Sequence, residues 1–256
     1  MVIFTCIFVC LTVILSGVST LFLTFSLLSD EWEFLTYEKA SIEEMAKLKN
    51  HSLQWLSGDV GKLFMPELTI TQNISGSVAY LVPARGGVNN LCPDLPDSVK
   101  STMEEDGFVL KTCISYLSND DITSRDTWLD RMRNLAMSCA MVSLILLAFS
   151  TPLGLLGLYK KQISTIMVNG VMYILAGVFG TFNLAFMHFK RAKPADGFYT
   201  STILDKNLPE DYMKARIFTV GWPPSAEWAG LIVCMIGSLF WLLLAKIYRL
   251  QILNPT

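Results

Sequence analysis

Two uncharged apolar runs, separated by a pair of lysines, decide the fold of this chain. Residues 134–189 read NLAMSCAMVSLILLAFSTPLGLLGLYKKQISTIMVNGVMYILAGVFGTFNLAFMHF, and Lys160 and Lys161 are the charged residues among them. A helix needs about 20 predominantly apolar residues to cross the hydrocarbon core of a bilayer. We therefore predict two membrane spans, 134–159 and 162–189, joined by a short basic hairpin.

Two further apolar runs lie near the ends of the sequence. Residues 2–29 carry no charge, and residues 221–245 carry one, Glu227, which we expect at the headgroup level or facing another helix. A cleaved signal peptide is the alternative for the first run, but its apolar stretch is longer than the roughly 7–15 residues typical of such peptides. We predict a single tetraspan domain over residues 1–256, membrane α-helical, with a left-handed four-helix transmembrane bundle.

Composition supports a membrane protein. Hydrophobic residues make up 52% of the chain and charged residues 16%, whereas soluble domains carry about 25% charged residues. The net charge of -2 gives no basic surface for nucleic acid. The lipid bilayer is the first predicted partner, and nucleic acid is not one.

The distribution of Lys and Arg predicts the orientation. Residues 160–161 and the basic residues of 246–249 would be cytoplasmic by the positive-inside rule, so both termini would be cytoplasmic. The basic residues of 190–193 argue the other way, since they would lie outside. The N-glycosylation sequons at Asn50 and Asn73 favour the first orientation, because both fall in the segment 30–133 between the first two spans.

The cysteines give a second indication. Four of the six fall in predicted spans, which leaves Cys92 and Cys113 as the pair in segment 30–133. An even pair in an extracellular loop predicts a disulfide, with two free thiols as the alternative.

The segment 30–133 has the pattern of a small folded β-rich extracellular module. We predict an amphipathic helix at 37–50, a hairpin with strands from 67 and at 78–82, a helical turn at 97–105 and a strand at 108–116. The second outer loop, 190–220, is mixed and partly aromatic. A helix extension with an aromatic belt is favoured there over an interaction surface.

Several residues resemble the signature of the claudin superfamily, which includes claudins, peripheral myelin protein relatives, and the gamma subunits of calcium channels and AMPA receptors. The family's first-loop motif is Trp, then Gly-Leu-Trp-x-x-Cys, then Cys. This chain follows that order, with Trp32 first, then the stretch from Gly87 to Cys92, and then Cys113. Asn89 stands where the motif has its second Trp. Two further matches are basic Arg133 before the second span and the pair Gly221-Trp222 before the fourth.

The resemblance implies a plasma-membrane protein acting through association with other membrane proteins. It would act at cell junctions, by self-association and adhesion, or as an auxiliary subunit that modulates an ion channel or a receptor, for example at synapses. Tetraspanins and connexins fit less well, because the Cys-Cys-Gly motif and second-loop cysteines that they respectively require are missing here.

Signs of catalysis are weak. The two histidines, His51 and His188, have no partner visible in the sequence, and no nucleophile, metal or phosphate-binding motif occurs. We expect no catalytic, cofactor or metal site, no small-molecule substrate and no enzymatic activity.

Overall fold

The computed structural model describes residues 2–67, 75–108, 111–116, 118, 122–124, 127–192, 201–202 and 208–253. The chain divides into two compact units, each described here by itself. The helical unit comprises Met1–Ser29, Met132–Lys190 and Trp222–Thr256, and the sheet module comprises Asp30–Arg131 and Arg191–Gly221.

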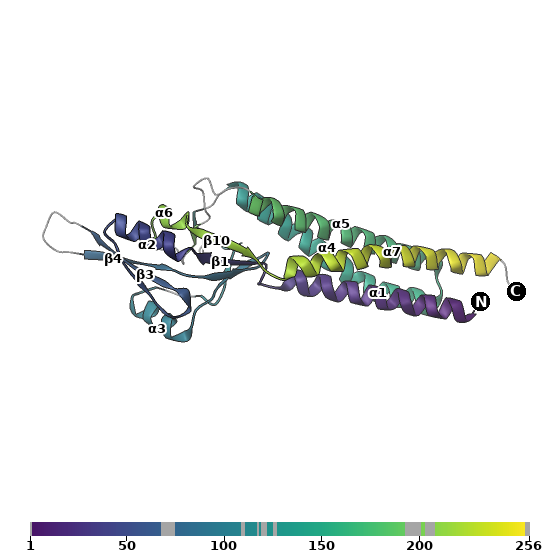
Figure 1. Cartoon of the computed structure of the whole chain (residues 1–256). Coiled ribbons are helices and arrows are strands. Elements are labelled where there is room, and N and C mark those ends of the chain that lie inside the picture. Colours follow the sequence, from purple (N-terminus) through teal and green to yellow (C-terminus); the bar gives the residue numbers. More distant parts are fainter. Residues whose placement is uncertain are drawn as a thin grey trace. The chain divides into compact units, whose positions relative to one another are not determined.

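Four long helices form the helical unit, where they run side by side as a bundle (Figure 1). They are α1 (Val2–Leu28), α4 (Thr127–Lys160), α5 (Ile163–Ala192) and α7 (Pro223–Leu253). Each is long and apolar enough to cross a membrane, so the four predicted spans are confirmed. Helix α7 begins at Pro223 rather than at residue 221, since proline is favoured in the first turn of a helix.

Small and polar residues line the inside of the bundle. A Cβ on Gly230 of α7 would lie 3.0 Å from Cβ of Phe22 on α1, and one on Gly170 of α5 would lie 3.1 Å from Cβ of Trp241 on α7. Trp241 in turn donates its indole N–H to Oγ of Ser16 on α1 over 2.6 Å. These glycines let the helices approach closely, so that van der Waals packing and hydrogen bonds hold them together.

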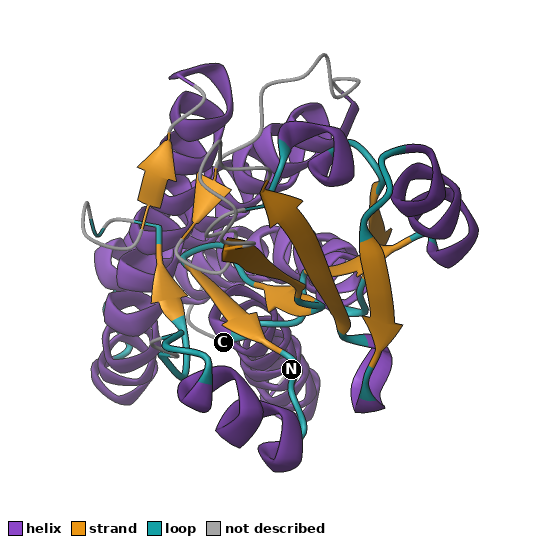
Figure 2. Cartoon of the chain, turned by 90° about the vertical axis from the view of Figure 1, so that its left-hand side faces the viewer, coloured by secondary structure: helices purple, strands orange, loops and turns teal. Residues whose placement is uncertain are grey.

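The sheet module contains a five-stranded antiparallel sheet in the order β10-β1-β5-β6-β7 (orange strands in Figure 2). Its strands are β1 (Glu33–Tyr37), β5 (Ala84–Gly86), β6 (Asn90–Pro93), β7 (Ile114–Ser115) and β10 (Arg216–Val220). Four strands come from the segment after α1, whereas β10 comes from the segment before α7. The two loop segments therefore fold into one sheet.

Two smaller antiparallel sheets complete the strands of the module. One is β2-β3-β4 and the other is β8-β9. Their bounds are β2 Ser52–Trp55, β3 Gly61–Glu67, β4 Ser75–Leu81, β8 Ile122–Ser124 and β9 Ser201–Thr202. The predicted hairpin is present as β3-β4, but its first strand begins at Gly61. Residues 68–71, which carry the alternation used to predict it, lie outside the described residues.

Short helices pack on these strands and close the core. They are α2 (Lys39–Leu48), α3 (Asp97–Glu105), α6 (Glu210–Met213) and the 3-10 turn η1 (Ser57–Asp59). Helix α2 buries Ile42 and Ala46, four residues apart and thus on one face. They join a core that includes Leu63, Tyr80 and Met103. The predicted helices at 37–50 and 97–105 are confirmed, while β7 occupies a small part of the strand predicted at 108–116.

Candidate interaction site in the sheet module

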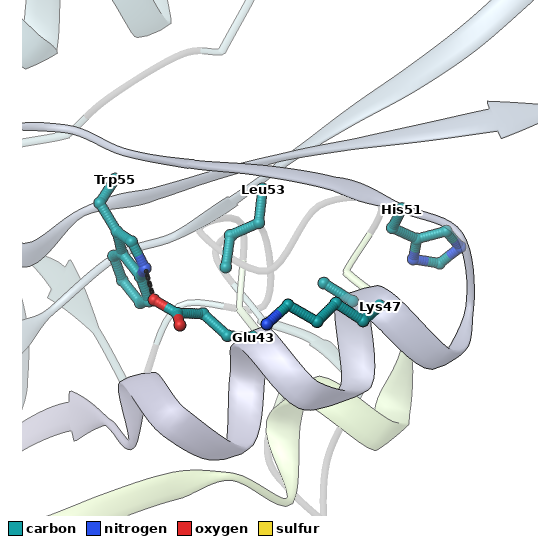
Figure 3. A pocket seen from close by; sticks show the side chains of 6 residues that line it. Glu43, Lys47, His51, Leu53 and Trp55 are labelled. Carbon is teal, nitrogen blue, oxygen red and sulfur yellow. Dashed lines mark hydrogen bonds between the residues drawn. The ribbon is translucent and has the colours of Figure 1, made fainter.

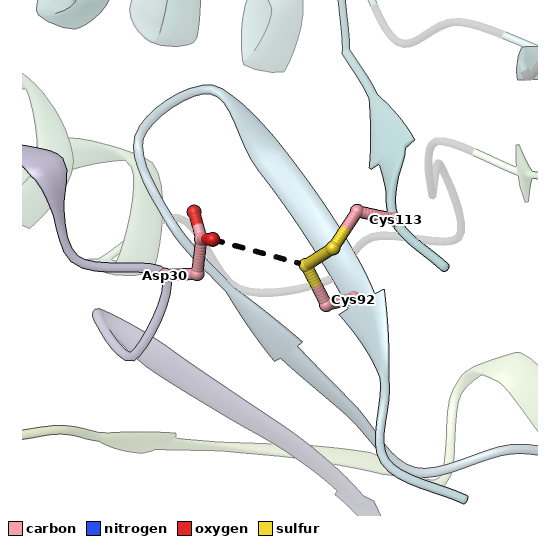
Figure 4. Close-up of side chains that lie close together, drawn as sticks. All are labelled: Asp30, Cys92 and Cys113. Carbon is pink, nitrogen blue, oxygen red and sulfur yellow. Dashed lines mark hydrogen bonds between the residues drawn. A yellow bond between two sulfur atoms is a disulfide. The ribbon is translucent and has the colours of Figure 1, made fainter. Parts of the chain in front are cut away.

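A disulfide joins Cys92 to Cys113, as predicted (Figure 4). Cys92 lies in β6, and the pairing of Asn90 with Ser115 and of Leu91 with Ile114 brings residue 113 opposite residue 92. The bond therefore continues the β6-β7 ladder by one cross-strand pair. It fastens the far edge of the five-stranded sheet, where β7 is too short to hold itself by backbone pairing.

Asp30 approaches this disulfide, with a carboxylate oxygen 4.0 Å from Sγ of Cys92 (Figure 4). A disulfide sulfur has no proton to donate and no thiolate charge, and metal ions bind cysteine as the thiolate. With the disulfide intact, the cluster offers a metal ion one carboxylate, and we assign no metal site to it.

The structure brings together two residues of the family signature that are distant in sequence. Trp32 is fully buried, and its backbone carbonyl accepts a hydrogen bond of 3.1 Å from the backbone N–H of Gly221. A Cβ at position 221 would overlap the carbonyl oxygen of Glu31, so glycine is required by the close approach of the two chain segments. The β1-β10 pairing thus ends on a tight contact between the two loop segments.

The other signature residues lie apart from that contact. Gly87 donates its backbone N–H to the carbonyl of Asn90 over 2.7 Å in the turn between β5 and β6. Arg133 is buried on α4, and Trp222, half exposed, precedes α7; both belong to the helical unit.

One of the two predicted glycosylation sites can be placed. Asn50 is exposed in the turn between α2 and β2, with a left-handed φ of 54° that asparagine tolerates better than most residues. An exposed turn suits a glycan, and the modification stays a prediction. Asn73 lies outside the described residues.

A cleft of about 240 Å³ lies between α2 and β2 (Figure 3). The Trp55 indole N–H donates a hydrogen bond of 3.0 Å to Glu43 across it, and Lys39 Nζ lies 5.3 Å from the centre of the same indole. Its lining consists of Glu43, Ala46, Lys47, His51, Leu53 and Trp55. The lining charges are of both signs, so the cleft has no strong preference for one kind of ion.

His51 has a partner that the sequence does not reveal. Its Nδ1 lies 2.9 Å from the hydroxyl of Tyr212, a buried residue of α6 that is 161 positions away. Burial, followed by the positive charge of Lys49, lowers the pKa of the His51 imidazole. This contact is a second link between the two loop segments.

A separate polar cluster joins β3, β4 and the end of α3. Lys62 donates to Oδ2 of Asp106 over 2.7 Å, and the hydroxyl of Tyr80 donates to the same oxygen. The hydrogen bonds from Lys62 and then from Tyr80 lower the pKa of Asp106. The cluster pairs opposite charges on the surface of the module.

Strand β10 is the most apolar exposed feature of the sheet module. Ile217, Phe218 and Val220 are 42%, 47% and 56% exposed. Among the strands that the structure describes, β10 pairs with β1 on one side and has no neighbour on the other. An apolar edge strand is a template for pairing with another chain.

The hydrogen bonds show which backbone groups of β10 point away from β1. Glu38 donates its N–H to the carbonyl of Ala215, and Gly221 donates to Trp32, so residues of odd number between them face β1. In an antiparallel ladder the alternate residues point their N–H and C=O groups the other way. Phe218 and Val220 therefore direct theirs away from β1.

Within the helical unit, Glu227 faces another helix. This was one of the two positions expected for it, the other being the level of the lipid headgroups. Its side chain is fully buried, and both carboxylate oxygens lie 3.1 Å from Nδ2 of Asn183 on α5. The sequence analysis missed this partner and the strand β10. Residues 216–220, RIFTV, are rich in β-branched and aromatic residues, a strand signal that the aromatic-belt interpretation of segment 190–220 overlooked.

No protein-family model matches the chain, and no curated protein matches its sequence. The resemblance to the claudin superfamily therefore rests on the signature residues quoted above.

Proposed function

We propose that the chain is a non-enzymatic plasma-membrane protein, similar to the claudin superfamily, that acts by association with other membrane proteins at cell–cell contacts. Three features support the proposal: four spanning helices, a disulfide-bonded sheet module formed largely between the first two of them, and the meeting of Trp32 with Gly221.

The exposed edge of β10 carries the proposal. At Phe218 and Val220 it combines apolar side chains with backbone hydrogen-bonding groups that point away from β1, and the two together allow strand addition. A non-enzymatic role is favoured because the polar side chains of the module bind one another. Glu43 binds Trp55, His51 binds Tyr212, and Asp106 binds Lys62.

The alternative function is an auxiliary subunit of an ion channel or neurotransmitter receptor. The observation that favours it is an exposed apolar stripe along α5, at helical spacing. The stripe consists of Val168, Val171, Leu175, Val178 and Phe182. Such a stripe suits lipid and equally suits a spanning helix of a partner.

Affinity purification of the tagged chain from its native membranes, with quantitative mass spectrometry, tests both functions. Phe218→Lys alters the edge of β10, and Leu175→Trp alters the α5 stripe as its matched control. If co-purified proteins are lost with Phe218→Lys but not with Leu175→Trp, the result supports association through the sheet module. Loss of a channel or receptor with Leu175→Trp alone supports the auxiliary role, and unchanged recovery with both variants contradicts both functions.

The predicted orientation has its own test. Glycosidase treatment should remove two glycans from the wild-type chain, and one each from Asn50→Gln and Asn73→Gln. A wild-type chain with no mobility shift, expressed in cells that glycosylate a control protein, would contradict the extracellular placement of segment 30–133.

A further inference from the structure

We propose that the predicted cytoplasmic end of the helical unit binds the headgroup of an anionic membrane lipid that carries more than one phosphate. The site is a basic cluster of four side chains from the α4–α5 hairpin and the end of α7. They are Lys160, Lys161, Lys246 and Arg249. The inference goes beyond the proposed function, because the ligand is a lipid and the sheet module takes no part in binding it.

Contacts between the helices fix how α4 lies relative to α7. A Cβ on Gly154 of α4 would lie 3.0 Å from the ring of Trp241 on α7. On α5, Gly170 lies against Trp241 and Gly180 against Leu231, so α5 runs antiparallel to α7. A tight hairpin joins α4 to α5 and reverses the direction of the chain. Helices α4 and α7 therefore run parallel from the contact between Gly154 and Trp241.

The basic cluster lies at one level of the bundle. From the contact of Gly154 with Trp241, a rise of about 1.5 Å per residue takes α4 about 9 Å to Lys160, and takes α7 about 7.5 Å to Lys246 and about 12 Å to Arg249. Figure 1 shows the connection between α4 and α5 at the end of the bundle where both termini lie. The four charges are thus gathered within about 5 Å of depth, on helices that touch.

The helical unit has no acidic side chain near the cluster. Its three segments contain one acidic residue, Glu227. Glu227 precedes Lys246 on α7 by about 28 Å along the helix axis. The four basic side chains are exposed, and they repel one another unless an anion lies among them. A headgroup with a single net charge balances one of them, whereas several phosphates balance most of them.

The backbone at Lys161 shows that its charge is placed against the local preference. Lys161 follows the end of α4 with a left-handed φ of 49°. The N–H of Gln162 donates to the carbonyl of Gly157 over 3.1 Å, and the N–H of Lys161 donates to that of Leu158 over 3.3 Å. Glycine is the usual residue at this position of such a helix end, because it has no Cβ to strain. Marking the cytoplasmic side does not require a second lysine here, since Lys160 is adjacent.

The depth of the cluster favours a lipid over a soluble anion. Leu155, Leu156 and Leu243 precede the basic residues on α4 and α7 and are exposed, so they face acyl chains. The basic side chains follow within two turns and reach the level of the headgroups. A lipid phosphate is held at that level by its own acyl chains. Clusters of this size next to membrane helices attract anionic lipids of the cytoplasmic leaflet.

A binding titration of the full-length chain tests the site. The purified protein in a neutral detergent is titrated against phosphatidylinositol bisphosphate labelled on an acyl chain, and fluorescence anisotropy gives the affinity. Each basic residue near an anionic surface contributes about 1 kcal/mol, so replacing one should weaken binding about fivefold. The variants are Lys160→Gln, Lys161→Gln, Lys246→Gln and Arg249→Gln. Arg131→Gln, which alters an exposed basic residue near the other end of α4, is the matched control and should bind like the wild type.

The Lys161→Gly variant separates the charge from the fold. Glycine suits the left-handed backbone at this position, so the variant should melt at or above the wild-type temperature while it binds the lipid about fivefold more weakly. Lys161→Arg should keep the wild-type affinity. Unchanged affinity of Lys161→Gly would overturn the proposed site, and this variant decides the question even where another fails to fold.

Competition distinguishes the sources of phosphate. The soluble inositol phosphate headgroup should displace the labelled lipid, and inorganic phosphate at the same ionic strength should not. Phosphatidylserine, with one net charge, should bind at least about tenfold more weakly than the bisphosphate. Equal affinity for phosphatidylserine, equal displacement by inorganic phosphate, or unchanged affinity in all four glutamine variants would overturn the proposal.

Discussion

The helical unit and the sheet module place polar and apolar side chains in opposite ways. Exposed side chains of the helices include Ile14, Phe25 and Phe149, whereas Ser143, Asn183 and Glu227 are wholly buried and hydrogen-bonded to neighbouring helices. In the sheet module Ile42, Leu63 and Tyr80 are buried. Charged pairs such as Lys39 with Asp59 lie on its surface.

The difference reflects two solvents. A helix in a bilayer gains nothing by hiding leucine from lipid, but a polar group in hydrocarbon must find a partner, so amides and hydroxyls turn inward. A module in water gains by burying apolar surface. Strand β10 departs from this rule, since it is a part of the sheet module with apolar residues on its surface. That departure is why we propose β10 as the association site.

The largest expected effect comes from Trp32, which lies directly before β1. Trp32→Ala should lower the free energy of unfolding by roughly 3–5 kcal/mol, because it empties a fully buried aromatic site. Trp222→Ala is the matched control, since that side chain is 50% exposed in the helical unit. Thermal unfolding in detergent measures both. Equal melting temperatures for the two variants would contradict the burial of the Trp32 side chain.

The disulfide should come next. Cys113→Ser should destabilise the sheet module by about 3 kcal/mol, the chain-entropy value for a loop of this length. Surface biotinylation should show reduced delivery of the variant, while Cys6→Ser on an exposed position of α1 should be delivered like the wild type. Normal delivery of Cys113→Ser, with unchanged protease resistance, would show that the ladder holds without the bond.

A smaller effect is expected inside the bundle. Glu227→Leu removes the partner of the Asn183 amide and should cost about 1 kcal/mol, the usual size of hydrogen bonds between membrane helices. Glu227→Gln keeps a carbonyl for Asn183 and should cost less. Unfolding by denaturant in mixed micelles would measure both. A larger loss for Gln than for Leu would mean that the hydrogen bond is not what holds α5 to α7.

The smallest effect is that of pH on the His51–Tyr212 contact. Because the folded-state pKa of His51 is lowered below its ordinary 6.5, folding favours the neutral imidazole. The contribution is present above about pH 6.5 and is lost as the pH falls below that value toward the folded-state pKa. Melting curves of the wild type and of His51→Gln, recorded on both sides of this range, should converge at the lower pH. A constant difference between them would contradict the assignment.

The four spans and the disulfide were predictable because each depends on local or countable features. Hydropathy alone identifies a helix in lipid, and Cys92 and Cys113 were the remaining pair after the spans were removed. Helix α2 was predictable from its periodicity. These elements need no knowledge of which distant residues meet.

The elements that the sequence did not predict depend on distant partners. Strand β10 forms against β1, and the Tyr212 that binds His51 is 161 positions away. The need for glycine at position 221 comes from the carbonyl of Glu31, another distant group. The β-branched and aromatic residues of 216–220 are compatible with a strand, but neither segment shows which distant strand it pairs with, and the aromatic-belt interpretation overlooked the strand signal.

The pairing of β1 with β10 also sets an order of events during synthesis. Residues 38–215 separate the two strands, so at about 5–20 residues per second the ribosome needs roughly 10–35 s to deliver β10 after completing β1. The edge of β1 that pairs with β10 stays open throughout that interval, although β5, β6 and both cysteines of the disulfide are made during it. The nascent chain therefore exposes an unpaired strand until the helices α4 and α5 have been made, and a chaperone or a neighbouring copy can reach that strand first.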